Sequence, residues 1–229
     1  MHPFIKNIGV NRAWLMAAVV LGTGLTAQAN NLLSNGSFET GNFNPSEPGS
    51  MLLTAGATDI TGWIVINGGL AWDGPQNPYG LTASDGSHFL DLTGDYDHAP
   101  YGGVEQTVAT TLGAQYQISF EVGSDVGYDS DQGSLPATPV SIQVTAGSSS
   151  GTFTTTTPAG NDLWQSFNLE FTATSSSTLI SLEGLASENI EYIGLDNVDL
   201  EAVPEPGTLM LLVGPGLLAF AKCRRLRKA

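Results

Sequence analysis

The chain has almost no cysteine. Of its 229 residues only Cys223 carries a thiol, and this residue lies in a basic C-terminal tail. A disulfide within the chain is therefore excluded, so a folded domain must be held together by burial of apolar side chains. A cysteine directly after an apolar run is a position for lipidation, but an incidental residue is the simpler interpretation.

Basic side chains are absent from the long middle of the chain. All seven Lys and Arg lie at residue 6, at residue 12 or from Lys222 onward, whereas all 22 Asp and Glu lie between Asn30 and Ala221. Proteins neutralise phosphates with Lys and Arg, so this distribution argues against nucleic acid, anionic lipid and phosphorylated ligands as partners. Carboxylates without basic partners repel one another, and bound cations relieve that repulsion, which makes calcium a candidate ligand.

Several signatures of catalysis are also lacking. The sequence has no phosphate-binding loop, no cysteine in the mature body and no third histidine there for zinc. Glycosidases work with two carboxylates, but the acids here follow no hydrolase spacing, and those in residues 125–131 lack the EF-hand pattern. We predict no catalytic residue and expect mostly solvated loop acids. The groups that could instead form an acid–base site or a weak calcium site are His88, Asp91, Asp95, Asp97, His98, Asp125, Asp129 and Asp131.

The N-terminus has the features of a secretory signal peptide. Lys6 and Arg12 form a positive n-region, residues 13–25 an apolar h-region, and Ala27-Gln28-Ala29 a small-residue cleavage site. We assign residues 1–29 to a signal helix that engages the Sec machinery, and we expect the mature chain to begin at Asn30.

Residues 30–202 alternate apolar and polar side chains and contain no long stretch with a 3.6-residue period. Such alternation predicts half-buried strands, and the Gly, Ser, Asn and Pro between them predict turns. We predict one all-β domain over residues 30–202, an antiparallel jelly-roll β-sandwich large enough to bury about 70% of its unfolded surface. The alternating apolar residues are Tyr116, Ile118, Phe120, Val122, Val140, Ile142, Val144, Phe167, Leu169, Phe171, Ile180, Leu182, Val198 and Leu200.

The last residues, 203–229, have three consecutive parts. Pro204-Glu205-Pro206 is followed by an apolar run from Thr208 to Ala221 and then by a basic cluster. The run is shorter than the roughly 20 residues that cross a bilayer comfortably. Basic residues directly after an apolar segment stay on the cytoplasmic side. These residues form the basic stop: Lys222, Arg224, Arg225, Arg227 and Lys228.

This tail resembles the PEP-CTERM sorting signal of Gram-negative bacteria that produce exopolysaccharide. The resemblance implies a short C-terminal hydrophobic helix and a membrane-embedded exosortase that cuts at or near Pro204-Glu205-Pro206 and moves the chain outward. It also implies transient attachment to the inner membrane and a final location at the cell surface or outside the cell. The alternative is a plain C-terminal anchor that happens to begin with these three residues.

The body resembles galactose-binding-like β-sandwiches. The resemblance rests on Asn35-Gly36-Ser37-Phe38-Glu39, Gly62-Trp63 and Leu195-Asp196-Asn197-Val198. Such domains include carbohydrate-binding modules and a domain-of-unknown-function family found in plant cell-wall proteins and in PEP-CTERM bacterial proteins. The resemblance implies the fold, and it implies a structural calcium to which Glu39 and Asp196 contribute. It does not imply one ligand, because such folds have many functions.

The sequence gives separate support for a role of Asp196. It has the strand parity of Tyr192, Val198 and Leu200, so we expect its side chain to point inward. A buried carboxylate needs a cation or hydrogen-bond donors, and oxygen ligands suit calcium. The alternative is a carboxylate that accepts hydrogen bonds from backbone amides at a strand end.

Aromatic residues in Gly- and Pro-rich segments are candidates for sugar recognition, because a ring face stacks on the C–H surface of a sugar. Packing at the rim of the sandwich is an equal alternative for each ring, and Trp63 and Trp164 are expected to be core residues. The candidate ligand-binding residues are Trp72, Tyr79, Tyr96 and Tyr101.

Together these patterns predict an exported, non-catalytic surface or matrix protein that associates with extracellular polysaccharide. Two alternatives remain: a polysaccharide hydrolase that works through carboxylates, and a purely structural matrix component whose acidic face is neutralised by divalent cations.

Overall fold

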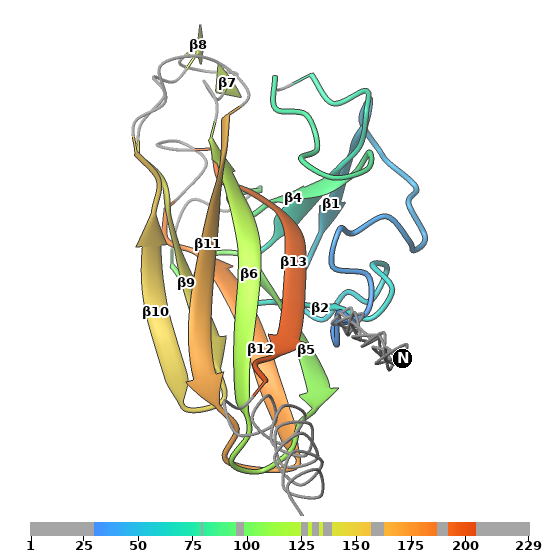
Figure 1. Cartoon of the computed structure of the whole chain (residues 1–229). Helices are drawn as coiled ribbons and strands as arrows, with labels where there is room; N and C mark the ends of the chain where they lie inside the picture. The colour runs from blue at the N-terminus through green and yellow to red at the C-terminus, as the bar shows by residue number, and fades with distance from the viewer. Residues whose placement is uncertain are drawn as a thin grey trace, which may run out of the picture.

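The computed structural model describes residues 30–78, 80–94, 99–124, 128–129, 133–134, 139–156, 163–186 and 192–204. Within these ranges the chain forms strands and turns and contains no helix (Figure 1). The strands are β1 (Ser50–Leu53), β2 (Ile64–Ile66), β3 (Leu70–Asp73), β4 (Phe89–Asp91), β5 (Gly103–Ala109), β6 (Gln115–Ser124), β7 (Tyr128–Asp129), β8 (Gly133–Ser134), β9 (Ser141–Ala146), β10 (Ser149–Thr154), β11 (Leu163–Thr172), β12 (Ser177–Gly184) and β13 (Gly194–Ala202).

Two antiparallel sheets form the body. The six-stranded sheet has the order β1-β3-β4-β13-β6-β11, and the five-stranded sheet has the order β10-β9-β12-β5-β2. Strands β7 and β8 pair only with each other. The last strand, β13, therefore lies inside its sheet between β4 and β6. The prediction of an antiparallel β-sandwich is confirmed, whereas the signal helix and the hydrophobic C-terminal helix lie outside the described residues.

The alternating patterns correspond to β6, β9, β11, β12 and β13. Along β6, the side chains of Tyr116, Ile118, Phe120 and Val122 are buried, as their spacing predicts. On β11 the predicted apolar face is only half buried at Phe167, because β11 is the edge of its sheet. The sequence did not reveal β10, whose residues are Ser, Thr, Gly and one Phe.

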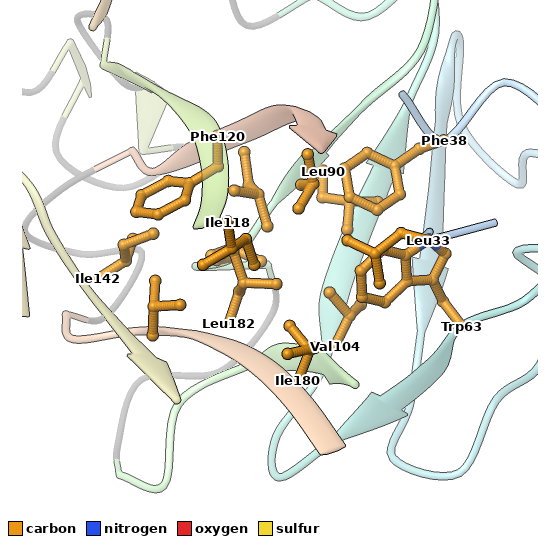
Figure 2. Close-up of a cluster of buried hydrophobic side chains, with 14 of the residues drawn as sticks. Leu33, Phe38, Trp63, Leu90, Val104, Ile118, Phe120, Ile142, Ile180 and Leu182 are labelled. Atoms are coloured by element: carbon orange, nitrogen blue, oxygen red, sulfur yellow. The ribbon is translucent and has the colours of Figure 1, made fainter. Parts of the chain in front are cut away.

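The core lies between the two sheets. Figure 2 shows Leu90, Ile118 and Phe120 of the six-stranded sheet facing Val104, Ile142, Ile180 and Leu182 of the five-stranded sheet. Leu33, Phe38 and Trp63 fill one side of this core, and each exposes 5% of its surface or less. The expectation that Trp63 is a core residue is confirmed. Burial of such large apolar side chains is the main stabilising contribution in a domain without disulfides.

The N-terminal segment pairs with the last strand. The main-chain N–H of Leu32 donates to the carbonyl of Leu200 at 2.8 Å, and that of Val198 donates to the carbonyl of Gly36 at 2.9 Å. Gly36 has to be glycine, since a β-carbon there would lie 1.9 Å from the carbonyl oxygen of Val198. The two ends of the body are therefore neighbours in space.

The expectation that Trp72 lies in a loop is wrong. Its Gly- and Pro-rich surroundings predict a loop, but it lies on β3 and only 1% of its surface is exposed. Its indole N–H donates to the main-chain carbonyl of Phe38 at 3.0 Å. The glycines and prolines mark the turns on either side of a strand only four residues long.

Candidate functional site

Part of the outer face of the six-stranded sheet is covered by the described residues between β3 and β4, 74–78 and 80–88, which we call the β3–β4 loop. Leu81 of this loop packs with Phe89, Tyr192 and Trp164 in a second apolar cluster outside the main core. The indole N–H of Trp164 donates to the carbonyl of Thr82 at 2.9 Å. Gly194 of β13 has no side chain to obstruct the loop: a β-carbon there would lie 2.4 Å from Leu81.

Asp196 of β13 connects the sheet to the β3–β4 loop by hydrogen bonds. One carboxylate oxygen, Oδ2, accepts hydrogen bonds from the main-chain N–H groups of Ser84 and Asp85, both at 2.9 Å. The other, Oδ1, accepts one from Asn197 at 2.7 Å. None of the residue's surface is exposed. Burial raises the pKa of Asp196 to about 7, although the three backbone hydrogen bonds act in the opposite direction.

The burial of Asp196 follows from the loop and not from its strand parity. Asp196 lies opposite Glu121 on the outer face, whereas Leu195, Val198 and Leu200 belong to the core. A β-bulge between residues 196 and 199 shifts the register, and Asn197 takes a φ of 50° there. The expectation that Asp196 and Val198 share a face is therefore wrong, while the expectation that Asp196 is buried is confirmed.

Glu39 holds the other end of the same loop. Its Oε1 accepts hydrogen bonds from the N–H groups of Ser87 at 2.7 Å and His88 at 2.6 Å. Its Oε2 accepts one from the hydroxyl of Ser87 at 2.9 Å and lies 3.3 Å from His88 Nδ1. Burial raises the pKa of Glu39, but the hydrogen bonds from Ser87 and His88 outweigh it, so this pKa lies below its usual value.

Glu39 and Asp196 thus bind neighbouring parts of one loop, and both do so mainly through backbone amides. This is the alternative to calcium that the sequence left open for Asp196. Calcium takes oxygen ligands, whereas every oxygen of these two carboxylates already accepts a hydrogen bond. Among the described residues, no group of three or more His, Cys, Asp or Glu is placed to hold a metal ion. Calcium binding therefore stays a prediction.

Glu121 and Ser84 add a third attachment that the sequence did not indicate. The hydroxyl of Ser84 hydrogen-bonds Glu121 Oε2, and the hydroxyl of Ser166 donates to Glu121 Oε1 at 3.0 Å. The only signal available in the sequence was the polar face of the alternating segment in which Glu121 lies. That pattern places Glu121 on the outer face but says nothing about a loop that covers it.

Two further acids are buried under the outer face near β1. Asp73 accepts a hydrogen bond from the Tyr192 hydroxyl at 2.8 Å, while its other oxygen has no hydrogen-bond partner among the described residues. Asp91 accepts hydrogen bonds from the N–H of Thr93 at 3.0 Å and from its hydroxyl. Burial, and then the charge of Asp73, raises the pKa of Asp91 to about 7, and burial also raises the pKa of Asp73.

The candidate sugar-binding aromatics do not form one group among the described residues. Trp72 is sealed in the core and presents no ring face to a ligand. Tyr101 is half-buried in the segment before β5. Tyr79 and Tyr96 lie outside the described residues. Trp164, expected in the core, lies on edge strand β11 and is half-buried against the β3–β4 loop.

Several other expectations also fall outside the described residues. They concern Asp95, Asp97, His98, Asp125, Asp131, the signal peptide, Glu205, Pro206 and the basic stop at Lys222, Arg224, Arg225, Arg227 and Lys228. Pro204 is described and exposed, two residues after the end of β13. A search of the described part of the chain for a helix long and apolar enough to cross a membrane found none.

Comparison with solved structures gives many distant matches. A family 4 carbohydrate-binding module has 20% identity and a TM-score of 0.39 over 75% of this chain and 99% of that one. The module TmCBM61, solved with β-1,4-galactotriose, has 18% identity and a TM-score of 0.43 over 76% of this chain and 100% of that one. The xylan-binding domain CBM22-1 of Paenibacillus barcinonensis Xyn10C has 18% identity and a TM-score of 0.39, with coverages of 70% and 99%.

No match was found among curated proteins. Two family models match the sequence. Residues 202–227 match the PEP-CTERM protein-sorting motif, and residues 31–200 match the family described as "Protein of unknown function (DUF642)". The chain is thus a member of the DUF642 family that carries a C-terminal PEP-CTERM sorting signal for export.

Proposed function

We propose that the protein is an exosortase-sorted, non-catalytic component of the cell surface or extracellular matrix that binds a neutral polysaccharide. The observation that carries this proposal is the charge of the body. Residues 30–204 contain carboxylates, hydroxyls and amides but no Lys or Arg. Such a surface repels anionic polymers and leaves hydroxyl-bearing, uncharged chains as the matching ligand class. Tyr79, Tyr96 and Tyr101 are the proposed stacking residues.

The positions of the acids favour binding over hydrolysis. A glycosidase needs one carboxyl group with a raised pKa beside a second carboxylate, both facing the substrate. Asp91 and Asp196 have raised pKa values, but neither faces a substrate. Asp91 exposes 7% of its surface, and Asp196 exposes none. Asp91 accepts hydrogen bonds from the N–H and the hydroxyl of Thr93, and Asp196 accepts them from three main-chain N–H groups, so both carboxyl groups support the fold.

A serine nucleophile is disfavoured for a similar reason. Gly147-Ser148-Ser149-Ser150-Gly151 has the spacing of a nucleophile elbow. In hydrolases that motif lies between a strand and a helix. Here the residues form the turn between β9 and β10 and the start of β10, where Ser149 pairs with Ala146. A hairpin does not give the serine the exposed, strained position that such a nucleophile needs.

An array of neutral and acidic polysaccharides, probed with the mature protein and followed by assay of reducing ends, tests the proposal. We expect binding to at least one neutral polymer and no new reducing ends. Tyr101→Ala should weaken binding, and Thr107→Ala, a change at an exposed position on β5, should not. New reducing ends would establish the hydrolase instead. If the protein bound none of the polymers, the remaining alternative would be a purely structural matrix component.

A further inference from the structure

Strand β10 is the free edge of the five-stranded sheet. It pairs with β9 over six residues, from Ser149↔Ala146 to Thr154↔Ser141. Figure 1 shows β10 on the outer side of this sheet, with β9 as its neighbour. An edge strand presents unpaired N–H and C=O groups that can pair with another strand.

The backbone groups that β10 directs away from β9 belong to Ser150, Thr152 and Thr154. The N–H of Thr155 donates to the carbonyl of Val140 at 2.9 Å, so residue 155 bonds toward β9. Residues of an antiparallel pair alternate in the direction of their hydrogen bonds. Residues 149, 151 and 153 therefore bond toward β9, and the three residues between them bond outward. All three have exposed side chains.

This edge has none of the usual protection against pairing. Proteins block exposed edges with charged side chains, proline or bulges. Strand β10 has no charged residue or proline, and its register with β9 is continuous. In a chain with a formal net charge of −15, the whole stretch between Asp131 and Asp162 contains no charged residue. Two copies can therefore approach along this edge without repulsion between carboxylates at the contact.

The other three edges of the two large sheets are covered, short or charged. The edge of β2 is capped by residues 56 and 57: the N–H of Gly56 donates to Val65 at 2.7 Å, and that of Val65 donates to Ala57 at 3.0 Å. Strand β1 has only four residues. Strand β11 carries the exposed carboxylate of Glu170. Among the described edges, β10 combines length, free backbone groups and absence of charge.

We propose that two copies of the protein associate through antiparallel pairing of β10 with β10, which joins two five-stranded sheets into one continuous sheet. The two-fold axis passes beside Thr152, the middle of the three outward-bonding residues. Thr152 of one copy then lies opposite Thr152 of the other, and Ser150 lies opposite Thr154. The partner is a second copy because the uncharged edge does not repel itself, whereas the rest of the body carries carboxylates and no Lys or Arg.

Sedimentation equilibrium of the full chain in a nonionic detergent tests this pairing. Thr152→Lys and Thr152→Glu each place like charges opposite each other at the two-fold axis. We expect both variants to raise the dimer Kd at least about tenfold, whatever the sign of the charge. Thr107→Lys and Thr107→Glu are the matched controls, because Thr107 is exposed on β5, an interior strand of the same sheet. They should leave the dimer Kd unchanged.

Amide hydrogen exchange locates the contact. The N–H groups of Ser150, Thr152 and Thr154 should exchange more slowly as the protein concentration rises, and those of β5 should not respond. A chain that is monomeric at every concentration overturns the proposal. So does a dimer that the Thr107 variants weaken as much as the Thr152 variants. Neither result depends on polysaccharide binding, so this proposal and the proposed function are tested separately.

Discussion

The carboxylate of Asp196 accepts hydrogen bonds from the main-chain N–H groups of Ser84 and Asp85, both at 2.9 Å, although more than a hundred residues separate them in sequence. One side chain of the central strand β13 thereby fixes the loop that covers the outer face of its own sheet. The relationship makes Asp196 a structural residue, and it can be tested without knowledge of any ligand.

Asp196→Ala should lower the free energy of unfolding of the body by about 1–3 kcal/mol, because it leaves the main-chain N–H groups of Ser84, Asp85 and Asn197 without their acceptor. Asp196→Asn, which keeps one carbonyl oxygen, should cost less. Urea denaturation of residues 30–204 measures both changes. Equal stability of Asp196→Ala and the wild type would contradict the role given to these hydrogen bonds.

Stability should fall as the pH rises from about 4 to about 7. The pKa values of Asp91 and Asp196 in the folded protein are raised from 3.8 to about 7. In this interval the folded state binds protons that the unfolded state has released, so each group stabilises the fold below the lower pKa and loses that contribution as the pH passes the upper one.

Asp91→Asn serves as the control for this pH dependence. It removes one titrating group, so the slope of unfolding free energy against pH should become shallower. Glu39 acts in the opposite sense, because its lowered pKa makes its contribution disappear as the pH falls through the acid range. A wild-type stability that increases from pH 5 to pH 7 would contradict the assignment of raised pKa values.

Calcium, if it binds at Glu39 and Asp196, should raise the thermal midpoint of the body, since a ligand that binds only the folded state stabilises it. Excess chelator should then lower the midpoint, and Asp196→Ala should abolish the difference. Differential scanning calorimetry with calcium and then with chelator measures this. An unchanged midpoint would mean that hydrogen bonds within the protein satisfy both carboxylates without a metal ion.

Trp72→Phe should destabilise the body by about 1–3 kcal/mol while leaving polysaccharide binding unchanged. The substitution leaves the buried carbonyl of Phe38 without its indole donor and creates a cavity. Urea denaturation and the polysaccharide assay, run on the same variant, separate the two roles. If Trp72→Phe were as stable as the wild type but bound polysaccharide more weakly, Trp72 would be a ligand-binding residue after all.

Alternation predicted the strands in which one face is buried against the core. The spacing of Tyr116, Ile118 and Phe120 was sufficient, because a half-buried strand has a period of two. Strand β10 was missed since its face toward the core is mostly Ser and Gly, which gives no apolar period. The tail was recognised because its three parts are contiguous in sequence.

The site was harder to predict because it depends on contacts distant in sequence. Glu39 and Asp196 were chosen from a resemblance, and the structure places them under the same loop. The β-bulge between residues 196 and 199 reverses the strand parity of Asp196 relative to Val198, and it leaves no mark on the pattern of apolar residues. The β3–β4 loop itself contains Gly, Pro, Ser and Asp, so its composition indicates turns but not the sheet face on which they lie.

The central position of β13 has a consequence for the order of events during export. The six-stranded sheet has a gap between β4 and β6 until residues 194–202 arrive, and these are the last residues before the sorting signal. The six-stranded sheet is therefore complete only once the segment that leads directly into the sorting signal has been inserted.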